Sequence, residues 1–232
     1  MTWLNTIINF FKDGGLVLFP LAIIFVVGVS IAIERWFYLT RETMKNRNLW
    51  DDVSPHLGAG NFKQAITLAN NSQAQIGTVL KYGLARLATA RRRDDIQQAM
   101  EESLLEIVPR LEKRTPYLAA LANIGMLIGL LGTIIALIHA FGAVSQANPA
   151  EKAGLLAAAI SEAMNATASG LFVAIVLLLS HMFLEAKTTA LIDSLEIAVV
   201  KFLNSITERY SEPAAPSPQH GMPPRAPAPR PA

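Results

Sequence analysis

The stretch that decides the fold is LANIGMLIGLLGTIIALIHAF, residues 121–141. It lies inside a longer run, from Thr115 to Ala150, that carries no charged side chain unless His139 is protonated. An uncharged apolar run of about 20 residues is long enough to cross the roughly 30 Å hydrocarbon core of a bilayer as a helix. The stretch therefore predicts a transmembrane helix, which we place at residues 116–143.

Two further runs have the same character. Residues 14–33 carry no charged side chain, and within residues 163–184 only His181 is ionisable. They predict transmembrane helices at residues 14–38 and 154–186. The fold class we expect is an all-α integral membrane protein with three spans.

The first run could instead be a secretory signal, which has basic residues before its apolar stretch and small residues after it. Here Lys12 stands beside Asp13, and residues 34–38 form a charged and aromatic border suited to a membrane interface. This pattern favours a span. Residues 1–13 would precede it as a short amphipathic segment.

Charge placement predicts the orientation of the spans. Residues 39–115 hold 12 Lys or Arg against 9 Asp or Glu, whereas residues 144–153 hold one Lys. The positive-inside rule then puts residues 39–115 and the C-terminus in the cytoplasm, and the N-terminus and the 144–153 loop in the periplasm. We expect the inner, or plasma, membrane of a bacterium.

The cytoplasmic parts are predicted to be largely helical. Helical periodicity marks Asn61–Leu87 and Asp94–Glu112, and the third span continues as an amphipathic helix over residues 187–210. The tail, residues 211–232, contains eight prolines and is expected to be disordered. It is a plain tail or a partner-binding arm.

Small residues are spaced for close helix packing. Gly125 and Gly129 form a G-x-x-x-G pattern, which lets two helix backbones approach. We expect Gly132 and Gly170 to belong to the same contact between the second and third spans.

The third span contains one acidic residue, Glu162. At about 100° per residue, Asn165 and Ser169 share its helical face. A carboxylate at membrane depth normally faces a bundle interior or a water-filled path, and three spans offer little interior. Either several copies enclose a polar lumen into which this face points, or Glu162 lies at the outer interface. We favour the lumen.

The other polar residues in the spans are explained by ordinary structural roles. A lone threonine in a membrane helix usually bonds to a backbone carbonyl one turn earlier, which applies to Thr133 and Thr167. His139 and His181, near span ends, are interpreted as interface anchors. The chain has no cysteine and no grouping of histidines or carboxylates typical of a metal or catalytic site. We expect no enzyme activity and no cofactor.

Two motifs resemble those of a known family. Gly129-Leu-Leu-Gly-Thr133 is similar to the G-L-L-G-T string of the MotA/TolQ/ExbB proton channel family, and residues 160–171, ISEAMNATASGL, resemble its I-x-E-A-L-x-x-T-A-x-G-L motif. Three spans in this order resemble the ExbB and TolQ branch. Met126 and Val176 stand where the family usually has proline.

The resemblance implies a homopentamer whose second and third spans enclose a channel for protons, or for sodium ions in some members. It also implies a single-span partner of the ExbD or TolR type with an intramembrane aspartate, and a client such as TonB or the Tol–Pal system. By motif, Thr133, Thr167 and Glu162 match lumen residues of the family. From the residues alone, a passive membrane scaffold with cytoplasmic partners is the alternative.

Overall fold

The computed structural model describes residues 17–87 and 92–210. The predicted amphipathic segment, residues 1–13, and the proline-rich tail, residues 211–232, lie outside these ranges, as do residues 14–16 of the first predicted span. The described chain is helical throughout apart from short connections. The helices are α2 (Leu18–Gly58), α3 (Phe62–Asn71), α4 (Gln75–Leu87), α5 (Arg93–Glu112), α6 (Thr115–Gln146) and α7 (Lys152–Tyr210).

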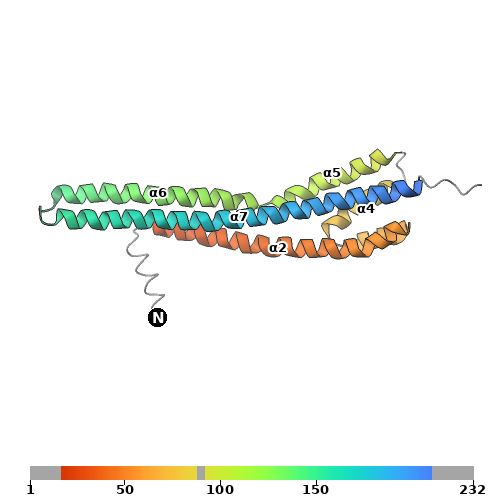
Figure 1. Cartoon of the computed structure of the whole chain (residues 1–232), viewed down its shortest axis with the longest axis horizontal. Helices are drawn as coiled ribbons and strands as arrows, with labels where there is room; N and C mark the ends of the chain where they lie inside the picture. The colour runs from red at the N-terminus through yellow and green to blue at the C-terminus, as the bar shows by residue number, and fades with distance from the viewer. Residues whose placement is uncertain (1–16, 88–91, 211–232) are drawn as a thin grey trace, which may run out of the picture.

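The helices form an elongated bundle (Figure 1). α6 and α7 run antiparallel as a hairpin, and α2 lies along them over part of their length. The hairpin extends beyond the start of α2 at one end. At the opposite end α4 and α5 pack against α7, and α3 packs against α2 and α4.

In the part of the chain that the structure describes, three stretches of helix are long and apolar enough to cross a membrane. They lie within Leu18–Gly58, Arg93–Gln146 and Lys152–Thr207. For the described residues, this confirms the prediction of an all-α protein with three helices able to span a membrane. The chain is a multi-pass membrane protein. Many large apolar side chains on these helices, such as Phe19, Ile138 and Leu179, are exposed in the single chain, as is expected of surfaces that meet lipid or other protein.

α2 and α7 are both longer than a bilayer requires. α2 has 41 residues and continues past the aromatic border at residues 36–38 without a break. α7 has 59 residues and continues past Glu185 to Tyr210, as its amphipathic pattern predicts. Its inward face beyond the span packs buried Leu195 and Phe202 against the shorter helices.

The predicted helical stretch Asn61–Leu87 is divided in the structure. α3 ends at Asn71, and Ser72 takes an extended backbone with ψ 143°. The hydroxyl of Ser72 accepts a hydrogen bond from the N–H of Ala74 (3.1 Å), which stabilises this turn before α4. Helical periodicity in the sequence could not reveal this break, because the buried apolar residues of α3 and α4 keep the same helical spacing across it.

The junction between α5 and α6 is a sharp turn held by α2. Arg114 has φ 70°, in the left-handed region, and its guanidinium pairs with Glu34 of α2 at 2.5 Å. Buried Arg35 donates a hydrogen bond to the carbonyl of Leu111. The first turn of α6 then contains Pro116, which suits a helix start.

Candidate functional site

α6 and α7 pack most closely through small residues. A Cβ on Gly132 would lie 2.8 Å from the Cβ of Ala166, and a Cβ on Gly125 would lie 3.2 Å from Val173. Between these two levels, Gly129 and Gly170 bring the two backbones together. This contact fixes which residues of the two helices lie at the same level.

α2 lies on one side of the α6–α7 pair. Just before its first residue, Val17 approaches Gly132, and Leu21 lies near Gly125. Further along, a Cβ on Gly28 would meet Leu177 of α7. One side of the hairpin is therefore covered by α2 in the single chain, and the other side is not.

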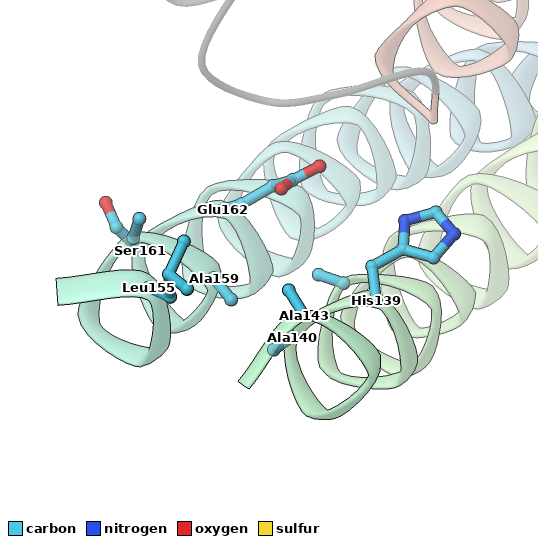
Figure 2. Close-up of a pocket in the computed structure, with 9 residues that line it drawn as sticks. His139, Ala140, Ala143, Leu155, Ala159, Ser161 and Glu162 are labelled. Atoms are coloured by element: carbon cyan, nitrogen blue, oxygen red, sulfur yellow. The ribbon is translucent and has the colours of Figure 1, made fainter. Parts of the chain in front are cut away.

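Glu162 lies beyond the start of α2, about one turn or 6 Å past Ala166 toward the α6–α7 loop. It lines a hollow of about 460 Å³ together with His139 of α6. Figure 2 shows both side chains projecting to the same side of the helix pair, above small residues such as Ala140 and Ala143. The hollow thus combines a carboxylate and an imidazole on a surface that is lined mostly by alanines.

Asn165 and Ser169 follow Glu162 along the same side of α7. Ser169 is 7% exposed and lies in a crevice with Leu21 and Phe25 of α2. Its hydroxyl donates a hydrogen bond to the carbonyl of Asn165 (2.7 Å). In the single chain Ser169 therefore packs between two helices, whereas Glu162 is half-buried in the open hollow.

Thr133 and Thr167 occupy the opposite side. They directly follow Gly132 and Ala166, which touch, so they lie at the same level of the hairpin. On a helix of about 100° per residue, Thr167 points about 160° away from Ser169, and hence away from α2. The Thr133 hydroxyl donates to the carbonyl of Leu130 (2.7 Å). Its oxygen can still accept a hydrogen bond from outside the helix.

The predicted site residues thus fall on two surfaces. Glu162 and Asn165 belong to the side on which α2 packs, and the two threonines belong to the side that α2 leaves open. Within the described ranges, no group of three or more histidines and carboxylates is placed to hold a metal ion. What the arrangement offers is two sets of polar groups able to contact water, ions or a further helix.

Sequence reasoning missed one residue of the hollow. The sequence predicts an interface anchor at His139, and the structure places this residue in the same hollow as Glu162. The signal that would have found it is the antiparallel pairing: once Gly129 is set opposite Gly170, His139 falls within about a turn of Glu162.

Comparisons with known proteins agree with the motifs. The MotA/TolQ/ExbB proton channel family matches residues 71–197, more than half of the chain. A putative biopolymer transport protein ExbB homolog from Methanothermobacter thermautotrophicus is 23% identical over 199 residues, which cover 85% of this chain and 69% of that protein.

Two bacterial proteins are also similar. The putative biopolymer transport protein ExbB-like 1 of Synechocystis is 25% identical over 224 residues, which cover 94% of this chain and 86% of that protein. The Tol-Pal system protein TolQ of Haemophilus influenzae is 37% identical over 94 residues, which cover 40% of this chain and 41% of that protein.

Proposed function

Because the chain belongs to the MotA/TolQ/ExbB proton channel family, we propose that it is the multi-span subunit of a motor driven by the proton-motive force. In this proposal several copies, five by the family resemblance, enclose an ion path with the α6 and α7 sides that α2 leaves open. The names of the relatives support a role in biopolymer transport or in a Tol–Pal-like system of the cell envelope.

The observation that carries the proposal is the position of the two threonines. Thr133 and Thr167 lie at one level, on the side of the hairpin opposite α2. In a ring of copies with α2 outside, each copy would present two hydroxyls at this level to the centre. Hydroxyls both donate and accept hydrogen bonds, so they can order water for proton transfer or bind part of a sodium shell.

A partner would supply the group that carries the proton. At the level of Thr133 and Thr167 this side of the hairpin offers hydroxyls and no carboxylate of its own, because Glu162 lies on the α2 side. A single-span subunit of the ExbD or TolR type, inserted in the centre with an intramembrane aspartate, completes the path. Such a partner would pass the motion to a periplasmic client.

Glu162 has a different place in this assembly. It lies nearer the α6–α7 loop, beside Asn165 and opposite His139, in the hollow that opens past the start of α2. We assign it to the periplasmic approach to the path, on the α2 side of the hairpin beyond the start of α2, where a fixed carboxylate attracts cations and orders water. The basic residues of the 39–115 segment support a cytoplasmic position for the opposite end.

The test is ion flux through the complete chain and its single-span partner in liposomes, followed with a pH-sensitive dye. Thr133→Val and Thr167→Val keep the side-chain shape and remove the hydroxyl. Loss of one hydrogen bond of about 1–1.5 kcal/mol in the path lowers flux about tenfold. Thr207→Val is the matched control, because Thr207 makes the same kind of backbone bond on α7 beyond the span.

Two results would overturn the proposal. One is wild-type flux in both threonine variants. The other is a purified complex that contains one or two copies of this chain and conducts nothing, which supports a passive scaffold. A sodium gradient imposed without a proton gradient identifies a sodium-driven relative, because flux would then follow the sodium gradient.

A further inference from the structure

A second polar pocket lies at the far end of the hairpin, where α5 meets α6 against α7. It has a volume of about 220 Å³, and its polar lining consists of Glu112, Thr115, His181, Glu185, Thr188 and Thr189. Glu112 is the last residue of α5 and Thr115 the first of α6, and the other four belong to α7. We call it the inner pocket.

Thr115 indicates that the inner pocket holds water. Thr115 is 4% exposed, and its hydroxyl has no hydrogen-bond partner in the part of the chain that the structure describes. Leaving a buried hydroxyl unsatisfied costs about 1–3 kcal/mol. A water molecule takes about 30 Å³, so the inner pocket has room for water that bonds to Thr115.

His181 and Glu185 form a pair with graded exposure. The Nδ1 atom of His181 lies 3.5 Å from Oε2 of Glu185. The His181 side chain is 18% exposed and that of Glu185 is 65% exposed, so the imidazole is inside and the carboxylate faces out. Imidazole is the side chain best suited to take up and release protons near neutral pH.

The neighbouring positive charges point elsewhere. Arg114 reaches Glu34 of α2, and Arg35 binds the carbonyl of Leu111. On α7, Lys187 contacts Thr40 and the ring of Trp36, both on α2. Lys113, next to Glu112, is exposed. The titratable groups that line the inner pocket are therefore Glu112, His181 and Glu185.

The inner pocket is in line with the threonines. Thr115 precedes Thr133 by 18 residues, and Glu185 follows Thr167 by 18 residues. Eighteen residues are about five helical turns, so each pair points in the same direction and is separated by about 27 Å along its helix. The inner pocket thus lies on the same open side of the hairpin, close to one bilayer thickness away.

We propose that the inner pocket is the proton-release site of this chain, with His181 and Glu185 as the relay. A proton from ordered water is taken up at Nε2 of His181, and the proton on Nδ1 passes to the Glu185 carboxylate. The imidazole is then neutral again, and the carboxylic acid loses its proton to bulk water. This inference rests on the proposed function, because it extends the same ion path.

Flux measurements on the full complex in liposomes test the relay. We expect His181→Ala and Glu185→Gln to lower proton flux about tenfold or more, which corresponds to about 1.4 kcal/mol in the barrier. Glu196→Gln, an exposed carboxylate further along α7, should leave flux unchanged. Added imidazole should restore flux to the His181→Ala variant, which a purely structural role of His181 would not allow. Wild-type flux in both variants, or no rescue by imidazole, overturns the relay.

A measurement without conduction separates the two proposals. In the purified chain, an acid-induced infrared C=O band that disappears in Glu185→Gln should shift in His181→Ala and stay unchanged in His139→Gln. If the band does not respond to His181→Ala, the inner pocket is not a coupled proton site, whatever the complex conducts. If the band shifts but the wild-type complex conducts no protons, the proposed function is wrong, while the coupling of His181 to Glu185 in the inner pocket is supported.

Discussion

A Cβ atom on Gly129 would lie 2.9 Å from the Cα of Gly170, and 3.0 Å from the carbonyl oxygen of Ala166. α6 and α7 therefore meet backbone to backbone at this level, with no side chain between them. Because neither backbone can yield as a side chain does, the position of one helix along the hairpin determines that of the other.

Gly129→Ala should lower the stability of the hairpin by about 1–3 kcal/mol, because the added methyl group must push the backbone of α7 away. Thermal unfolding of the detergent-solubilised chain, followed by circular dichroism, measures the loss. Gly142→Ala on α6 and Gly154→Ala on α7 are matched controls, since nothing lies within 4 Å of a Cβ at either position. Equal melting temperatures for Gly129→Ala and the controls would contradict the backbone contact.

Gly28 and Leu177 should be energetically coupled. A Cβ on Gly28 would lie 2.5 Å from Cδ2 and 2.8 Å from Cδ1 of Leu177, which is fully buried. Gly28→Ala alone should destabilise α2–α7 packing by about 1–3 kcal/mol, and Leu177→Ala alone by about 2–5 kcal/mol. In the double variant the methyl group enters the space left by Leu177, so its cost should be smaller than the sum. Strict additivity would show that the two do not touch.

Asn46 should stabilise the start of α4 from a distance of 30 residues. The N–H of Ile76 donates a hydrogen bond to Oδ1 of buried Asn46 (3.1 Å). Asn46→Ala leaves this N–H without a partner and should cost about 1–3 kcal/mol in unfolding free energy. It should also speed hydrogen exchange at the Ile76 amide. Asn48→Ala, two residues on and exposed, is the control and should change neither measurement.

Glu162 and His139 should act together on flux. They line one hollow, so replacing either by glutamine should change the same step of ion uptake. We expect Glu162→Gln and His139→Gln to lower flux about tenfold each, an effect of about 1.4 kcal/mol. The loss of flux in the double variant should be clearly smaller than the product of the two single losses. Ser161→Ala, on the rim of the same hollow, is the control. A fully multiplicative loss would show that the two side chains act separately.

The spans could be predicted from the sequence because they depend on charge-free length alone. The same is true of the extension of α7, where Leu191, Leu195 and Phe202 continue one buried face. The angular argument also placed Glu162, Asn165 and Ser169 on one side of the third span. These features follow from helix geometry within one segment, which a sequence contains in full.

What covers each side of a helix could not be predicted in the same way. Ser169 and Glu162 share a side of α7, yet α2 begins between their levels and packs against Ser169 only. His181 lies in one pocket with Glu112 because two separate events coincide: the antiparallel pairing of α6 with α7, and the left-handed turn at Arg114. Contacts between segments that are distant in the chain depend on several such packing events together, and these cannot be read from a single sequence.

The length of α7 has a mechanical consequence. Its 59 residues contain no proline, so one continuous helix of about 90 Å runs from the α6–α7 loop to Tyr210. It joins the level of Glu162 to that of Phe202, where α4 and α5 pack against it. In the proposed motor, a torque on the end of α7 that carries Glu162 would therefore reach the far end of α7 through one unbroken helix.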